Sequence, residues 1–352
     1  MQDLIADVVR ERLPAVSIVK LLDGAILFET ECSYDRLNLL CFNNIFAVID
    51  ILEMSAENVR AGPGSAAPLE HHIRKITAEK KHREPGAALS EGARAVLSEN
   101  NKKIKTFRLV CSLENKPASI NEILKQDIEN FIARNSTLKV ERSGPDTEFW
   151  FLYRREGFSL FMKRLTHSIE KKLRPGELTP QLAWLLCRTG GLKPGETVLD
   201  PFCGYGAIAE AALKHFPIKF FYASDVDNRC IKITRSRPGL KSERCGIRTA
   251  DVFSISEFIP AGGIDAIITD PPWGMYKETQ IPLAKFYEET LALFSKLLKD
   301  GGRAVILSAA REELEAAAAK IKTLPITQTI PILVSGKKAS VFTLKKKTDS
   351  TV

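Results

Sequence analysis

Apolar and polar positions follow two different periods along this chain, and together they predict a mixed α/β protein. Near the start, apolar residues recur at helical spacing over residues 2–13. Two short apolar runs, residues 16–22 and 25–29, then flank a turn and predict a β-hairpin. Helical periodicity returns over residues 34–51. We therefore predict a small α+β unit within residues 1–65.

A charged stretch separates this unit from the next one. It begins with a loop rich in Gly, Pro and Ala, and helical, charged segments follow, so residues 66–100 are predicted to be a helical linker. The pattern then changes to strands at 106–113, 138–141, 147–154 and 158–165, with an amphipathic helix at 119–133. These elements predict a second α+β unit, residues 101–168.

Strands and helices alternate in the remaining residues, 169–352, which is typical of an α/β domain. Strands are expected at 198–199, 219–223, 248–250, 266–268 and 303–308, and helices at 181–189, 208–213, 286–298 and 312–321. Two final strands flank Ser335-Gly336 and predict a terminal hairpin.

The first candidate site is the loop between the strand that ends at Asp200 and the helix that begins near Ile208. Gly204 and Gly206 allow a turn with positive φ there. Such a loop brings backbone N–H groups and a helix N-terminus toward a ligand, at the edge where open α/β sheets bind nucleotide-like molecules. The spacing is neither the fingerprint Gly-x-Gly-x-x-Gly nor a P-loop, and a tight turn without a ligand is the alternative.

The second candidate site reads Asp270-Pro271-Pro272-Trp273 and directly follows an apolar strand. Two consecutive prolines donate no backbone hydrogen bond and fix φ, so the Asp270 carboxylate and the Pro271 carbonyl form a stiff corner that only accepts hydrogen bonds. Acceptors beside an aromatic plane suit a planar group with an NH₂, such as a nucleobase stacked on Trp273. A Pro-Pro turn closed by a core tryptophan is the alternative.

Acidic residues recur at the ends of the intervening strands. Asp225 stands roughly 20 residues after the glycines, the spacing at which an acidic side chain reaches ribose hydroxyls in nucleotide sites. Asp251 follows the next strand and is itself followed by apolar residues. Capping of the next helix is the alternative for each, as it is for Asp227. Their regular recurrence at strand ends favours one shared site.

These residues resemble the motifs of class I S-adenosylmethionine-dependent methyltransferases that modify exocyclic amino groups. Leu199-Asp-Pro-Phe-Cys-Gly204, with Glu210 and two alanines, resembles the branch that methylates guanine N2 in RNA. The resemblance implies a Rossmann-like domain with a seven-stranded sheet, S-adenosylmethionine as cofactor, RNA (tRNA favoured) as substrate, and catalysis by Asp270, Pro271, Pro272 and Trp273. It implies cofactor contacts by Leu178, Thr179, Asp200, Phe202, Cys203, Gly204, Gly206, Ala207, Asp225, Val226, Asp251, Val252 and Asp270.

The segments ahead of this domain carry a second resemblance. The order of strands in residues 101–168, with Gly144-Pro-Asp146 before the third strand, resembles a THUMP domain, which is an RNA-binding module. Residues 1–60 resemble the ferredoxin-like unit that commonly precedes it. The complete expectation is a THUMP-domain-containing RNA (guanine-N2) methyltransferase.

Composition supports this picture without deciding it. The net charge of +8 fits a polyanionic partner, although solvated faces are the alternative for each basic run. Seven cysteines without a C-x-x-C pair indicate neither zinc nor disulfides and fit a reducing cytoplasm. Asp3 and Asp7 argue against a signal peptide, and no membrane partner is expected.

His71, His72 and His82 lack the partners of a metal site, so no metal is expected. A monomer is favoured.

Three residues depart from the family pattern: Tyr205 and Ala207 in the glycine loop, and Trp273 where Tyr or Phe is commoner. Two other functions therefore stay open. One is an adenine-N6 methyltransferase acting on RNA or DNA, which would use the same acceptor corner. The other is a catalytically inactive RNA-binding protein whose loop no longer holds the cofactor. The target nucleotide, and one or two methyl transfers, depend on the shape of the pocket.

Overall fold

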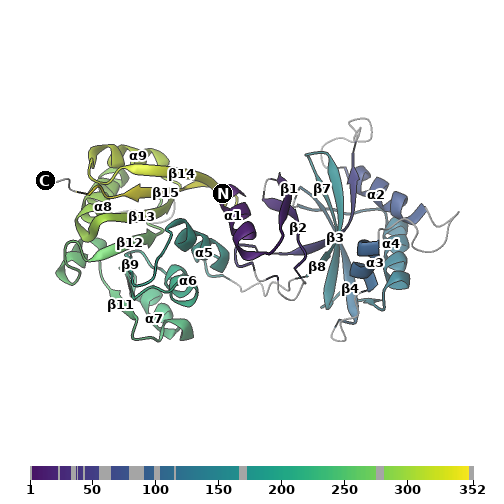
Figure 1. The fold of residues 1–352 in the computed structure, drawn as a ribbon, viewed down its shortest axis with the longest axis horizontal. Coiled ribbons are helices and arrows are strands. Elements are labelled where there is room, and N and C mark those ends of the chain that lie inside the picture. Colours follow the sequence, from purple (N-terminus) through teal and green to yellow (C-terminus); the bar gives the residue numbers. More distant parts are fainter. Residues whose placement is uncertain are drawn as a thin grey trace. The chain divides into compact units, whose positions relative to one another are not determined.

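The chain is divided by its internal contacts into two compact units, residues 1–41 with 171–352 and residues 42–170 (Figure 1). The computed structural model describes residues 2–22, 24–32, 37, 39–42, 44–54, 65–78, 91–98, 104–114, 116–165, 173–274 and 281–348. Within these residues, no helix has both the length and the apolar character that crossing a membrane requires.

The unit formed by residues 42–170 is an α+β layer in which three helices cover one face of a sheet (Figure 1). The strands run in the order β3-β8-β7-β4-β5, and β6 pairs with β4. Their bounds are β3 Phe46–Glu53, β4 Thr106–Leu113, β5 Lys116–Pro117, β6 Lys139–Val140, β7 Thr147–Arg154 and β8 Phe158–Arg164, and the helices are α2 Ala67–Ala78, α3 Glu91–Ser98 and α4 Glu122–Asn135. Phe107, Phe149 and Phe161 form the centre of the core between the sheet and the helices.

The helix predicted over residues 34–51 is wrong where the structure describes it. Phe46–Glu53 is the strand β3, which pairs antiparallel with β8. Its residues alternate between more and less buried positions, and Val48, Ile49 and Ile51 are β-branched side chains that favour a pleated strand. A short apolar run does not distinguish helix from strand by period alone, so tertiary pairing decided the outcome.

His72 lies in the core of this unit. The imidazole is fully buried, with Nδ1 2.8 Å from the Ser159 hydroxyl and Nε2 2.9 Å from the Asp50 carboxylate. Burial lowers the pKa of His72, and the hydrogen bond with Asp50 opposes that change. The ring therefore joins α2 to β3 and β8. His82, its suggested partner in the sequence, lies outside the described residues.

The predicted N-terminal helix and hairpin are confirmed as α1 (Gln2–Arg12), β1 (Ser17–Leu22) and β2 (Ala25–Glu29). The two strands form a sheet of their own, and β3 belongs to the other unit's sheet. Strand pairing therefore does not join the elements that we predicted as one unit over residues 1–65. The boundaries of the four predicted segments stay predictions.

The C-terminal sheet has seven strands in the order β11-β10-β9-β12-β13-β15-β14, which confirms the predicted Rossmann-like sheet. β15 runs antiparallel to both of its neighbours, β13 and β14, and the other neighbouring strands of this sheet pair in parallel. The strands are β9 Thr197–Asp200, β10 Phe220–Asp225, β11 Cys245–Thr249, β12 Ile264–Thr269, β13 Leu298–Ser308, β14 Ile326–Val334 and β15 Lys337–Lys345. The helices are α5 Pro180–Thr189, α6 Ala207–His215, α7 Asn228–Ser236, α8 Leu283–Leu297 and α9 Arg311–Lys320, with short 3-10 helices η3 Pro238–Leu240 and η4 Val252–Glu257.

Helices cover this sheet on both faces, which explains why its central strands are continuous apolar runs (Figure 1). Leu199, Ile267 and Ala304 face a core that includes Leu291 of α8 and Leu314 of α9. On the opposite face, a Cβ at Gly190, directly after α5, would lie 2.5 Å from Ile268 and 3.5 Å from Val305. Burial on both faces fixes the register of β12 and therefore the position of the residues that follow it.

Gly206 ends the loop between β9 and α6 and is the N-cap of that helix. Its φ is 81°, a left-handed conformation that L side chains rarely adopt. A Cβ there would lie 2.7 Å from Thr234 Cγ2 and 2.9 Å from Leu240 Cδ1. Both backbone conformation and close packing therefore require glycine at this position.

We expect Gly206→Ala to lower the free energy of unfolding by about 2–5 kcal/mol, because the left-handed conformation costs about 1–2 kcal/mol and overpacking costs a further 1–3 kcal/mol. Gly262→Ala is the matched control, since Gly262 has φ 64° but a Cβ there would meet no described atom within 4 Å. Urea denaturation of both variants tests this. Equal losses in the two variants would contradict the packing argument.

Candidate active site

The carboxyl ends of β9 and β12 lie side by side, which brings the two motifs to one edge of the sheet. The strands pair in parallel, with Leu199 opposite Ile267. At their ends, the Thr269 hydroxyl donates a 2.6 Å hydrogen bond to the Asp200 carboxylate. The chain reverses its direction of travel across the sheet between these strands, the position at which open α/β sheets bind ligands.

Asp225, at the end of β10, braces the glycine loop. Its Oδ2 accepts the Gly204 N–H at 2.9 Å, and its Oδ1 accepts the Asp227 N–H at 2.9 Å. From α7, the Thr234 hydroxyl donates to the Gly204 carbonyl at 2.9 Å. The loop is thus held by groups of the protein itself. Each carboxylate oxygen can accept a second donor, so the predicted contact of Asp225 with a ribose stays a prediction.

The other loop residues that we predicted as cofactor contacts are buried or partly buried. Cys203 is buried, and its N–H donates to the Ser224 carbonyl at 2.9 Å. Phe202 is partly buried, with its ring centroid 5.7 Å from that of Phe286. Ala207 is the first residue of α6.

Two large apolar side chains are exposed at the outer strand ends, where water normally disfavours them. Val226, directly after β10, is 65% exposed, and Phe253, in η4, is 41% exposed. Val252 instead lies in the core and is only 3% exposed, although the sequence analysis selected it. Asp251 caps η4 by accepting the Phe253 N–H at 2.9 Å. The sequence placed an apolar pair after Asp251 but did not tell which of the two faces outward.

The segment that contains Leu178 and Thr179 is tied to the glycine loop's helix by Arg237, which the sequence analysis did not select. The Arg237 guanidinium pairs with Glu177 on one side and with Glu210 of α6 on the other. Thr179 caps α5 by accepting the Leu182 N–H at 3.2 Å. The structure therefore connects this segment with the loop through ion pairs, while direct cofactor contacts by Leu178 and Thr179 stay predictions.

Tyr205, the unusual residue of the glycine loop, lies beneath a cation. The Arg174 guanidinium carbon is 5.5 Å from the centre of its ring. Such a contact is worth about 0.5–1 kcal/mol at an exposed site. It gives the Tyr205 ring a partner within this chain.

Hydrogen bonds hold the acceptor corner at two points. The Trp273 indole N–H donates to Asp270 Oδ1 at 2.8 Å, and the buried Tyr287 hydroxyl donates to the Pro272 carbonyl at 3.0 Å. Tyr287 is also 2.7 Å from the Ser308 hydroxyl. Within the described part of the chain, Asp270 Oδ2 and the Pro271 carbonyl accept no hydrogen bond. These two oxygens are the acceptors that the sequence analysis assigned to an amine.

Burial of like charges dominates the electrostatics of this edge. Burial raises the pKa of Asp200 to about 8, against the opposing hydrogen bonds from Thr269 and Phe202, and Asp225 and Asp270 raise it further. Burial also raises the pKa of Asp270 to about 7, and the Trp273 hydrogen bond opposes this. The carboxylates are therefore spaced so closely that a cation at this edge would be stabilised.

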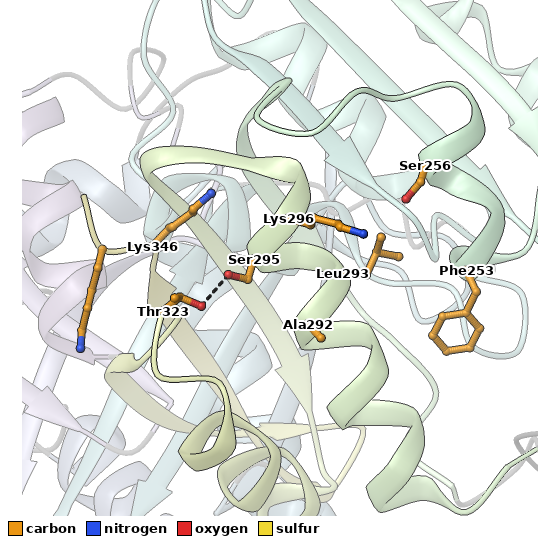
Figure 2. A pocket seen from close by; sticks show the side chains of 9 residues that line it. Phe253, Ser256, Ala292, Leu293, Ser295, Lys296, Thr323 and Lys346 are labelled. Carbon is orange, nitrogen blue, oxygen red and sulfur yellow. Dashed lines mark hydrogen bonds between the residues drawn. The ribbon is translucent and has the colours of Figure 1, made fainter. Parts of the chain in front are cut away.

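Two cavities lie elsewhere on the same unit. One, of about 570 Å³, runs alongside α8 from Phe253 past Lys296 toward Lys346 (Figure 2). The other, of about 310 Å³, lies against β10 and β11 beside Arg248. Neither is lined by a residue of the two motifs. Among the described residues, no group of three or more His, Cys, Asp or Glu side chains is arranged to hold a metal ion.

The sheet order, the glycine loop after its central strand and the acceptor corner after the neighbouring strand define the fold of class I methyltransferases. Residues 168–329 match the family model described as "RMKL-like, methyltransferase domain". Residues 168–329 are therefore similar to that methyltransferase family.

Individual relatives of this chain are also methyltransferases by name. The chain is 35% identical over 155 residues to tRNA (guanine(6)-N2)-methyltransferase of Thermus thermophilus, covering 43% of this chain and 45% of the relative. It is 24% identical over 246 residues to U6 snRNA (guanine-N(2))-methyltransferase THUMPD2 of Bos taurus, covering 65% of this chain and 48% of the relative. The chain thus spans less than half the length of either curated relative. The solved structure of TrmN from Thermus thermophilus superposes with a TM-score of 0.72 at 20% identity, covering 98% of this chain and 96% of that one, which is a likeness of fold.

We expect Thr269→Val to destabilise the protein more at pH 9 than at pH 6. Above a pKa of about 8 Asp200 is ionised, and a buried carboxylate that loses a donor costs about 1.5–3 kcal/mol, whereas the neutral acid loses about 0.5–1.5 kcal/mol. Because the folded-state pKa is raised, stability falls as pH rises toward that pKa. Loss of the Thr269 donor raises the pKa of Asp200 further, so in this variant the fall should continue to higher pH. Urea denaturation at the two pH values measures it.

Thr290→Val is the control for this substitution. Thr290 is also buried, but its hydroxyl has no hydrogen-bond partner among the described residues. Its replacement should be neutral or stabilising at both pH values. If the loss of unfolding free energy in Thr269→Val, relative to the wild type, is the same at both pH values, the hydrogen bond to Asp200 does not cause a pH-dependent effect.

Proposed function

We propose that this chain is an S-adenosylmethionine-dependent methyltransferase that modifies the exocyclic N2 amine of a guanosine in RNA, with tRNA favoured. One observation carries the proposal most strongly. The two acceptors without a donor among the described residues, Asp270 Oδ2 and the Pro271 carbonyl, follow the strand next to the one that leads into the glycine loop. A methyl donor and an amine acceptor can therefore share one edge of the sheet.

The residues present fit this cofactor. Its positively charged sulfonium and amino groups suit an edge where Asp200, Asp225 and Asp270 are close enough to raise the pKa of Asp200. The exposed Val226 and Phe253 side chains suit the two faces of an adenine ring. The glycine loop and the N-terminus of α6 follow β9, the strand that lies between β10 and β12 in the sheet. When bound, the cofactor supplies a methyl group that is already activated by its positive sulfur.

The protein's task in such a reaction is to position the amine and exclude water. Asp270 Oδ2 and the Pro271 carbonyl would each accept one hydrogen of the NH₂ group. This draws the nitrogen lone pair out of conjugation with the ring and directs it at the methyl group. The ionised form of Asp270 is the stronger acceptor, so its pKa of about 7 in the free protein places the change in kcat/KM near neutral pH.

The assignment of the substrate combines the site with the relatives. Both curated relatives named above methylate guanine N2, one in tRNA and the other in U6 snRNA. A net charge of +8 fits either polyanion, and we propose that the THUMP-like region, residues 101–168, contributes to binding it. We further propose a cytoplasmic protein, because the seven cysteines form no disulfide among the described residues, as a reducing compartment would keep them.

We expect Asp270→Ala to lower kcat about a hundredfold or more, while S-adenosylmethionine still binds. Loss of a charge-assisted hydrogen bond costs about 1.5–3 kcal/mol, and misalignment of the amine adds to it. The assay is transfer of a labelled methyl group to unmodified total RNA, followed by mass analysis of the nucleosides, with isothermal titration of the cofactor in parallel. The product expected from the wild-type protein is N2-methylguanosine.

The same measurements separate the alternatives. Asp300→Ala, a half-exposed carboxylate on the β13 strand, should leave the rate unchanged. N6-methyladenosine in the product would replace the proposal by adenine methylation. Failure of the wild-type protein to bind S-adenosylmethionine would identify a catalytically inactive RNA-binding protein.

We also expect S-adenosylmethionine to release protons when it binds at pH 7.5. A cation beside Asp200 and Asp270 lowers both pKa values, which start at about 8 and about 7, so up to about one proton should leave. Titrations in phosphate and in Tris, whose ionisation enthalpies differ, measure the number. Identical binding enthalpies in both buffers would mean that neither carboxyl responds to the ligand.

A further inference from the structure

The strand-end aspartates of this sheet share one way of holding their carboxylates, and Asp270 cannot use it. Asp200 accepts the N–H of Phe202 at 3.1 Å, Asp225 that of Asp227 at 2.9 Å, and Asp251 that of Phe253 at 2.9 Å. In each case the donor is the backbone two residues further along the chain. Two residues after Asp270 stands Pro272, which has no N–H.

The Trp273 side chain supplies a hydrogen-bond donor in place of the backbone N–H that Pro272 lacks. Its indole N–H donates to Asp270 Oδ1 at 2.8 Å. An indole N–H lies in the plane of its ring, so this bond orients the ring and the carboxylate together. With Oδ1 engaged, Oδ2 is the oxygen of Asp270 that has no partner among the described residues.

The backbone between the two residues is fixed as well. Pro271 and Pro272 restrict φ, and Tyr287 holds the Pro272 carbonyl at 3.0 Å from the side of α8. Gly274 follows with φ 75°, and a Cβ there would lie 2.8 Å from Leu283 Cδ2. The distance between Asp270 and Trp273 is therefore set by a stiff turn, and the hydrogen bond costs little further ordering.

We propose that Trp273 is a positioning residue, whose indole N–H holds the Asp270 carboxylate with Oδ2 directed to the substrate amine. This rests on the proposed function and assigns to Trp273 a role beyond stacking on the target base. The hydrogen bond also favours the ionised form of Asp270, because a donor stabilises the charged acceptor. Loss of the N–H should therefore raise the pKa of Asp270 above its value of about 7.

Other charged groups near Asp270 do not replace this donor. Asp200, at the end of β9, carries the same sign of charge and donates no hydrogen bond when ionised; Asp270 adds to the effect of burial in raising the pKa of Asp200. Tyr287 on α8 gives its hydrogen bond to Pro272, and Glu313 of α9 is a further negative neighbour of that tyrosine. Among the described residues, Trp273 is the hydrogen-bond donor to Asp270.

Trp273→Phe tests the proposal, since it keeps an aromatic plane and removes the N–H. A hydrogen bond to a charged group corresponds to about one to two pKa units, so the acidic limb of the kcat/KM profile, which reports the free protein, should move upward by about that amount. Activity at pH 7 should fall about fivefold or more and recover near pH 9.

Trp184→Phe is the matched control, because the buried Trp184 indole N–H has no acceptor among the described residues. Its pH profile should coincide with that of the wild type. Trp273→Ala is the second variant, and it should show the same upward shift of the acidic limb. If the limb of Trp273→Phe stays in place, whether or not the rate falls, Trp273 acts through its ring alone and the proposal is overturned.

A measurement without turnover separates this proposal from the proposed function. In protein labelled with ¹³C-aspartate, the carboxyl resonance absent from Asp270→Asn reports the pKa of Asp270 directly. An upward shift in Trp273→Phe supports the hydrogen bond's role even if the wild-type protein methylates no RNA, which would refute the enzymatic function separately. An unchanged pKa overturns the inference even if N2-methylguanosine is formed.

Discussion

The need of each strand-end carboxylate for a hydrogen-bond donor is the constraint on which this edge of the sheet depends. Parallel strands place Asp200, Asp225 and Asp270 at the same edge, where burial disfavours the charge of Asp200 and Asp270. The donors that they recruit belong to the loops that follow the strands, such as Phe202 and Gly204. Satisfying the carboxylates therefore shapes those loops, and the shape of the loops creates the site.

The same arrangement leaves the site electrostatically incomplete. Burial, and to a smaller extent the neighbouring carboxylates, raise the pKa of Asp200, which means that ionising it costs free energy in the folded protein. A cation at the edge would offset that cost. Stability and ligand preference are thus two consequences of one charge distribution, and the exposed apolar Val226 and Phe253 beside it extend the preference to a ligand with an aromatic part.

Much of this fold can be predicted from sequence, because most of its strands are recognisable from their own short stretch of residues. Buried parallel strands such as β12 are continuous apolar runs, and residues after them stand at the carboxyl edge whatever the details of packing. The pattern failed at residues 34–51, because Phe46–Glu53 is a strand only through its pairing with β8. The cofactor contact of Val252, which the family resemblance implied, stays a prediction; in the structure Val252 is buried and the neighbouring Phe253 is exposed.

The residues that support the site could not be predicted from the sequence, because each contacts residues that are far away along the chain. Thr269 meets Asp200 from another strand, and Arg237 joins Glu177 to Glu210 from the end of α7. Neither residue belongs to a recognisable local motif. Only the three-dimensional pairing of strands and helices identifies them.

The number of acceptors still without a donor bears on which nucleophile the corner fits. Trp273 and Tyr287 engage Asp270 Oδ1 and the Pro272 carbonyl, which leaves two oxygens without a donor among the described residues, Asp270 Oδ2 and the Pro271 carbonyl. An NH₂ group has two hydrogens and can satisfy both. A hydroxyl would satisfy one, and a ring carbon neither, and each buried acceptor left unpaired costs about 1–3 kcal/mol. Under the proposed function, the corner would therefore favour an exocyclic amine over nucleophiles that carry fewer hydrogens.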